Sequence, residues 1–154
     1  VGKALTGGYL SLAATLCTQD VSDTICAGGA GVFMHGPTFM ANPLACAIAQ
    51  KSIDLLFSND WQTQVKRVGE ALRQGLQSCL SLNSVADVRV IGAIGVVEMK
   101  DNVDVNTLQP EFVKQGIWLR PFGKLVYMMP PYISSDRDIE TLCKASYRVL
   151  AEHA

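Results

Sequence analysis

The stretch VADVRVIGAIGVVEMK, residues 85–100, holds two short runs rich in β-branched residues on either side of Gly92. Such runs, separated by a turn residue, predict a pair of antiparallel strands. Two more short apolar runs follow, IWLRPFG at 117–123 and LVYMMPP at 125–131, and both read as strands. The second half of the chain is therefore expected to contain a small antiparallel sheet.

A long helical pattern precedes these strands and a second one follows them. Residues 59–82 place apolar side chains at helical spacing with charge on the other side: Trp61, Val65, Val68, Leu72, Leu76 and Leu80. The chain closes with a helical segment that Ser134 or Ser135 could cap. Helices that flank a sheet predict a small α/β unit of its own over residues 59–154.

Between the strands, residues 107–116 predict a short helix. Asn106 and Gln109 have the spacing of a capping box, and Gly116 is a suitable terminator.

The first 58 residues are less polar than the rest of the chain. Residues 9–17 are short and apolar, as in a buried strand, and Thr18 is a candidate N-cap for a short helix that ends before Gly28. Asn42 and the proline after it predict the start of a second helix over residues 43–57. One strand and two helices cannot cover one another's apolar faces, so we expect residues 1–58 to belong to a larger layered domain.

Composition limits the classes of function. The chain has 154 residues, of which 49% are hydrophobic and 18% charged, and this balance suits a globular protein. A net charge of −1 gives no basic field for nucleic acid or anionic lipid, and no apolar run has the roughly 18 residues of a membrane span. Because the chain begins with Val1 and not methionine, we expect further residues to precede it.

The cysteines and histidines argue against disulfides and metal. There are five cysteines, an odd number without a CxxC pair, and two histidines. A zinc site is not expected from this set, and the cysteines are interpreted as reduced thiols of a cytoplasmic protein.

Lys3 stands among glycines and apolar residues, in VGKALTGG, and the next acidic residue along the chain is Asp20. A buried or desolvated lysine amine can attack a carbonyl near neutral pH, and small neighbours let the backbone approach a bound group closely. The residues alone leave the alternative open that Lys3 is an ordinary solvated lysine.

The segment HGPTF, residues 35–39, combines a rigid Gly36–Pro37 turn with the hydroxyl of Thr38 shortly before a helix. Backbone amides with a hydroxyl beside them suit a phosphate group. The alternative is that Thr38 only completes a turn.

Arg120 lies between apolar residues in WLRPFG. Its planar guanidinium matches a carboxylate in two-point geometry, whereas a structural ion pair with Glu98 or another acid is the alternative. Tyr127 and Tyr132 could line the same cleft, although aromatic residues in strands more often belong to the core.

The combination of these segments in this order is more specific than any one of them. GKALTGG, then HGPTFMANPLACAIA, then IWLRPFGKLVYMMPPY resembles the class III aminotransferases, which use pyridoxal 5′-phosphate and have fold type I. The resemblance runs over nearly the whole chain. It implies an α/β fold that forms the C-terminal portion of such an enzyme: the tail of the large cofactor domain at 1–58 and the small C-terminal domain at 59–154.

The resemblance also implies roles for individual residues. Lys3 matches the lysine that binds pyridoxal phosphate covalently and then moves a proton. Gly36, Pro37 and Thr38 match the loop that reaches the cofactor phosphate of the partner subunit in a homodimer, with Gly36 also beside the substrate. Arg120 matches the arginine that binds the substrate carboxylate, and Tyr127 matches a tyrosine near the substrate cleft.

The likeness extends to enzymes of biotin synthesis. The implied reaction moves the amino group of S-adenosylmethionine onto 8-amino-7-oxononanoate and gives 7,8-diaminononanoate. In the family, the acidic partner of the pyridine nitrogen and a glycine-rich phosphate loop precede the lysine, so the chain alone is expected to be an inactive fragment. Two alternatives remain: another class III aminotransferase that acts on ω-amino acids, and a non-catalytic fragment or interaction domain.

Overall fold

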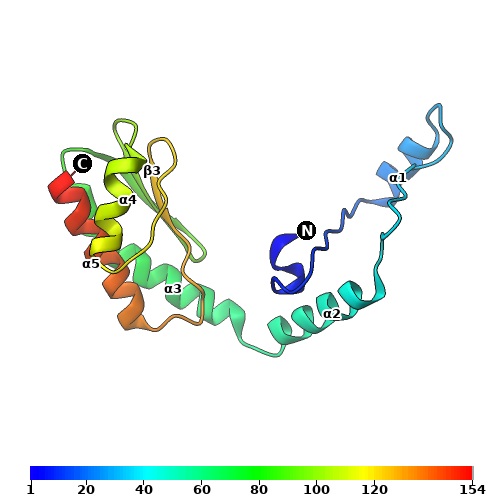
Figure 1. Cartoon of the computed structure of the whole chain (residues 1–154), viewed down its shortest axis with the longest axis horizontal. Coiled ribbons are helices and arrows are strands. Elements are labelled where there is room, and N and C mark those ends of the chain that lie inside the picture. Colours follow the sequence, from blue (N-terminus) through cyan, green and yellow to red (C-terminus); the bar gives the residue numbers. More distant parts are fainter. Residues whose placement is uncertain (154) are drawn as a thin grey trace. The chain divides into compact units, whose positions relative to one another are not determined.

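The computed structural model describes residues 1–153 and divides into two compact units, Val1–Asp60 and Trp61 onward (Figure 1). This division lies two residues after the boundary predicted from the rise in polarity at position 58. Each unit has its own helices, and they are described separately below. The assignment of the first unit to a larger cofactor domain stays a prediction.

The second unit contains a three-stranded antiparallel sheet in the order β1-β2-β3, formed by β1 (Val85–Ile91), β2 (Ile94–Met99) and β3 (Leu125–Met128). The predicted hairpin is confirmed. Gly92 turns the chain between β1 and β2 with a φ of 53°, a conformation that suits a residue without Cβ.

Three α-helices belong to the described part of this unit: α3 (Trp61–Leu76), α4 (Val105–Lys114) and α5 (Asp136–His153) (Figure 1). Helix α3 contacts β1, β2 and α5, and α4 contacts α5. The core between helices and sheet is apolar, and its fully buried side chains include Val68, Leu72, Leu76, Val97, Phe112, Val126 and Leu150. One face of the sheet is thus covered, as expected from the helical pattern.

Gly69 on α3 lets that helix approach the hairpin closely. A Cβ at this position would lie 2.3 Å from the carbonyl oxygen of Gly92. The glycine in mid-helix therefore has a packing reason that outweighs its lower helix propensity.

Two details of the helices in the second unit differ from the prediction. Helix α3 ends at Leu76 and passes into the 3₁₀ helix η2 (Gln77–Ser81), which turns Leu80 outward to 48% exposure. The tighter winding breaks the 3.6-residue spacing. The predicted Asn106–Gln109 capping box is wrong because Asp104 caps α4: its Oδ1 accepts from the Asn106 amide at 3.0 Å.

Residues 117–123 do not form the predicted strand. Pro121 removes a ladder donor, and the β-bridge that the segment does form is at Phe122, whose backbone exchanges two 2.9 Å hydrogen bonds with Leu125 across the turn at Gly123. The run at 125–131 is a strand only to Met128, because two prolines follow.

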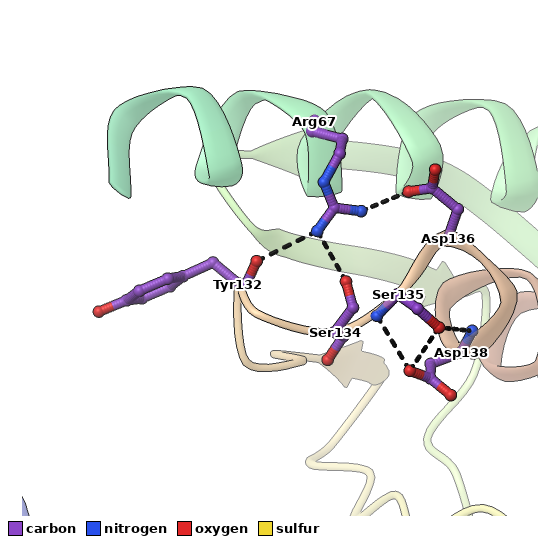
Figure 2. Close-up of polar contacts among 6 residues, drawn as sticks. All are labelled: Arg67, Tyr132, Ser134, Ser135, Asp136 and Asp138. Atoms are coloured by element: carbon purple, nitrogen blue, oxygen red, sulfur yellow. Dashed lines mark hydrogen bonds and ion pairs between the residues drawn. The ribbon is translucent and has the colours of Figure 1, made fainter. Parts of the chain in front are cut away.

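Arg67 on α3 joins this helix to the segment before α5 (Figure 2). Its guanidinium pairs with Asp136 and donates to the carbonyl oxygens of Tyr132 at 3.2 Å and Ser134 at 2.7 Å.

The side chains of Ser135 and Asp138 cap the start of α5 reciprocally, which confirms Ser135 as the N-cap. Their hydrogen bonds hold the pKa of Asp138 below its usual value, Ser135 Oγ being the main cause.

We expect Arg67→Met to lower the free energy of unfolding by about 1–2 kcal/mol, since two backbone carbonyls and Asp136 lose a charged donor at a partly exposed site. Arg73→Met is the matched control. Among the described residues Arg73 pairs with Glu70 alone, on its own helix, and this pair is worth roughly 0.2–0.5 kcal/mol. Urea unfolding of both variants measures the difference; equal losses would show that the Arg67 contacts contribute no more than an exposed helical pair.

The first unit contains η1 (Lys3–Thr6), α1 (Gln19–Cys26) and α2 (Pro43–Phe57). Both predicted N-caps are confirmed. Thr18 Oγ1 accepts from the Val21 amide, and Asn42 Oδ1 accepts from the amides of Leu44 and Ala45 at 3.0 and 3.1 Å.

Residues 9–17 are not a strand. Apart from a turn bond from the Tyr9 amide to the Thr6 carbonyl oxygen, the described backbone of this run pairs only where Val1 and Ala14 exchange hydrogen bonds of 2.8 and 2.9 Å. Without a second strand beside it, the apolar run has no ladder to complete. In the part of the chain that the structure describes, no helix is long and apolar enough to cross a membrane.

Candidate functional site

Lys3 is the first residue of η1 and has a left-handed backbone, with φ at 51°. The left-handed region is uncommon for a residue with a Cβ, and such outliers gather at functional sites. The side chain is exposed, and among residues 1–153 it has neither an ion pair nor a hydrogen bond. Its amine is therefore not engaged by any neighbour in this unit.

The loop at Gly36–Thr38 runs into a turn that the backbone itself closes. The Met40 amide donates to the Pro37 carbonyl oxygen at 3.0 Å. Thr38 is exposed, and its hydroxyl makes no hydrogen bond within the described chain. The turn thus forms without the Thr38 hydroxyl, which leaves that group free to bind a ligand.

The backbone amides of Leu44 and Ala45 at the start of α2 are not free to bind an anion. Asn42 Oδ1 already accepts from the amides of Leu44 and Ala45. Ala41 precedes this cap with a left-handed φ of 54°, a second strained position beside the loop. An anion here would depend on Thr38 and on amides of the turn, not on the helix end.

Arg120 lies in the second unit, is exposed, and makes no ion pair or hydrogen bond with any described residue. The alternative of an ion pair with Glu98 is wrong, because Glu98 pairs with Arg89 at 2.5 Å and Arg89 also holds Asp87 at 3.0 Å. Buried residues on both sides, Leu119 and Pro121, fix the backbone that carries Arg120.

Tyr127 is on β3, opposite Val96, and its side chain is on the sheet face away from the core. It is 37% exposed, whereas its neighbours Val126 and Met128 are buried. Arg120 and Tyr127 each lie two residues outside the hydrogen-bonded pair Phe122–Leu125, one before the turn and one after it. Arg120 and Tyr127, seven residues apart in sequence, therefore lie at matching positions on the two arms of one hairpin.

Tyr132 is 38% exposed, and its ring points away from the Arg67 contacts in Figure 2. It is thus not a core residue.

The cysteines take no part in these sites. All five are free, and burial raises the pKa of Cys79 and of Cys143 to about 11, so these two thiols are unreactive near neutral pH. Residues 1–153 contain no group of three or more His, Cys, Asp or Glu side chains that could hold a metal ion.

Solved transaminases share this fold. A structure of the enzyme named adenosylmethionine-8-amino-7-oxononanoate aminotransferase from Methanocaldococcus jannaschii superimposes with a TM-score of 0.82 at 28% identity, over 98% of this chain and 37% of that one. An amine transaminase from an uncultivated Pseudomonas species, solved in its PLP-bound form, gives 0.86 at 26% identity, over 99% and 38%. The α/β fold expected for a portion of a fold-type-I transaminase is confirmed.

The chain belongs to the class III aminotransferase family, whose model matches residues 1–150. Several relatives carry the name adenosylmethionine-8-amino-7-oxononanoate aminotransferase. That of Mycobacterium leprae is 51% identical over 149 residues, which are 97% of this chain and 34% of the relative. That of Corynebacterium glutamicum is 51% identical over 146 residues, 94% of this chain and 34% of the relative.

These matches confirm the family resemblance. The chain spans about a third of the length of the curated relatives it matches.

Proposed function

We propose that this chain forms the C-terminal part of a pyridoxal-phosphate aminotransferase of biotin synthesis. The complete enzyme would transfer the amino group of S-adenosylmethionine to 8-amino-7-oxononanoate in two half-reactions. The 51% identity to two enzymes of that name is the observation that carries this proposal. The free amine of Lys3 on a left-handed turn supports it from the structure.

The residues present fit the cofactor. The Lys3 amine has no ion pair or hydrogen bond among the described residues that would have to break before it binds an aldehyde, and a free hydroxyl in a turn is suited to bind a phosphate. Pyridoxal phosphate, when bound, supplies an electron sink for the substrate's α carbon. Lys3 would anchor the cofactor and then hold or return the proton at that carbon.

The phosphate role falls to Gly36, Pro37 and Thr38. In this proposal the loop of one subunit binds the cofactor phosphate of its partner in a homodimer, with Gly36 beside the substrate. Thr38 would donate its hydroxyl hydrogen, which no residue of the described chain accepts.

Substrate recognition falls to Arg120 and Tyr127. The unpaired guanidinium of Arg120 would bind a carboxylate through two parallel hydrogen bonds. Tyr127, on the outer face of β3, would contact the same substrate.

The test uses the full-length protein that carries this sequence. We expect spectral turnover of the bound cofactor with S-adenosylmethionine as amino donor, followed by formation of 7,8-diaminononanoate. Turnover with simple ω-amino acids but not with S-adenosylmethionine would assign the protein to the other branch of the family. Absence of turnover with every donor would contradict an aminotransferase function.

We expect Thr38→Val to weaken cofactor affinity roughly 10- to 150-fold, the effect of losing one hydrogen bond to a charged group. Thr38→Ser is the matched control, because it retains the hydroxyl and should stay near the parent value. Cofactor titration of the full-length protein measures both. Unchanged affinity in Thr38→Val would show that the hydroxyl does not contact the phosphate.

A further inference from the structure

Thr6 is 1% exposed, and it is one of two buried polar residues among those described. The other, Ser146, donates to Leu142 within its own helix. Thr6 instead ends the 3₁₀ turn that starts at Lys3, and its hydroxyl donates to the carbonyl oxygen of Leu10. This bond closes the Gly7–Gly8 loop that follows the turn.

A second contact holds the same turn from outside. Ser52, on α2, donates its hydroxyl hydrogen to the carbonyl oxygen of Ala4 at 3.3 Å. Ala4 is the residue directly after Lys3 and accepts also from the Gly7 amide at 2.9 Å. Helix α2 therefore contacts the Lys3 turn through a residue 48 positions away in sequence.

The left-handed backbone of Lys3 needs such support. A residue with a Cβ does not keep a φ of 51° unless its surroundings fix the chain on either side. Backbone bonds inside the turn join Leu5 to Gly2 and Gly7 to Ala4. The hydroxyls of Thr6 and Ser52 are the side-chain groups that fix the turn from its C-terminal side.

On the basis of the function proposed above, we propose that Thr6 and Ser52 are positioning residues for the Lys3 amine. They act through the backbone: by holding the turn, they fix the direction in which the Lys3 side chain leaves the chain. Neither residue touches the cofactor in this proposal. Loss of either hydroxyl would let the Lys3 backbone relax toward common φ values and turn its amine away from the cofactor aldehyde.

The experiment measures how fast Lys3 of the full-length protein captures pyridoxal phosphate. Borohydride fixes the adduct, and peptide mass spectrometry compares incorporation at Lys3 with that at Lys51. Lys51 is a suitable internal reference because it lines, with Thr6 and Ser52, a cavity of about 370 Å³. A general disturbance of this region would change both lysines, whereas loss of positioning would change Lys3 alone.

Thr6→Val keeps the side-chain shape and removes the hydroxyl, and we expect it to lower the Lys3-to-Lys51 ratio about 10-fold. Thr6→Ser keeps the hydroxyl and should stay within about 2-fold of the parent. Ser52→Ala breaks a longer, more exposed bond and should lower the ratio about 3-fold. Thr6→Val and Ser52→Ala should lower kcat with little change in the Michaelis constants, and Thr6→Ser should leave both near the parent values.

An unchanged Lys3-to-Lys51 ratio in Thr6→Val would overturn the positioning role and leave the proposed function standing. If Thr6→Val does not fold, Ser52→Ala decides: a normal ratio there contradicts the proposal, and a lower ratio with the melting temperature retained supports it. Failure of the parent protein to label Lys3 at all, with Lys51 labelled, would instead contradict the proposed function itself.

Discussion

Replacing Lys3 with alanine is expected to lower transamination by the full-length protein by roughly 10²- to 10⁴-fold or more, the range lost when a positioned proton-transfer group is removed. The physical reason is that the Lys3 amine has no partner among the described residues and that the Lys3 backbone is held in a left-handed conformation. Lys51, the other lysine of this unit, is on the regular helix α2 and does not have that backbone conformation. Lys3→Ala should also abolish the absorption of the covalently bound cofactor.

Lys51→Ala is the matched control for that experiment. Lys51 is exposed on α2 in the same unit and should leave both activity and absorption near the parent values. Borohydride reduction of the parent protein should place the cofactor mass on the peptide that contains Lys3. Labelling confined to Lys51 or Lys124 would refute the assignment.

The parts of the fold that local pattern can determine are the parts that the sequence predicted well. The hairpin around Gly92 needs only alternation and a turn residue, and the caps at Thr18, Asn42 and Ser135 need only a side chain next to its own helix. The two strands that do not form fail for different reasons. Residues 9–17 have no second strand beside them, since the partner of their backbone away from the adjacent turn is Val1, whereas residues 117–123 carry Pro121, which cannot donate to a ladder.

The candidate site was predictable in residue type but not in conformation. Family resemblance pointed to Lys3, Thr38 and Arg120, and the structure adds that each of the three is exposed and without a partner in the described chain. The left-handed φ of Lys3 has no signal in the sequence beyond its glycine neighbours. Thr6 and Ser52 were missed because their hydroxyls act on backbone carbonyls, and the contact from Ser52 spans 48 residues.

That Arg120 has no counterion among the described residues also had to come from the structure. The sequence allowed Glu98 as a counterion of Arg120, but Glu98 is already paired with Arg89. Asp87 lies opposite Glu98 in the sheet, and Arg89 binds both carboxylates. The Arg120 guanidinium is therefore left without an ion pair at an exposed position. An exposed guanidinium without a counterion contributes little to stability and is available to bind a carboxylate.

Arg120→Ala is therefore expected to raise the Michaelis constant for 8-amino-7-oxononanoate roughly 100- to 1,000-fold, because a two-point hydrogen bond to a carboxylate is lost. Arg120→Lys should give an intermediate value, since it keeps the charge but not the planar fork. Steady-state kinetics of the full-length protein, with each substrate varied in turn, separates the two half-reactions. The constant for S-adenosylmethionine should change much less.

Arg137→Ala serves as the control, because Arg137 is an exposed arginine on α5 in the same unit. It should leave both Michaelis constants unchanged. The thermal stability of Arg120→Ala should also match the parent, since Arg120 makes no ion pair or hydrogen bond among the described residues that its removal could break. Equal increases in both Michaelis constants, or a clear drop in melting temperature, would show instead that Arg120 supports the structure of the hairpin and does not bind the carboxylate.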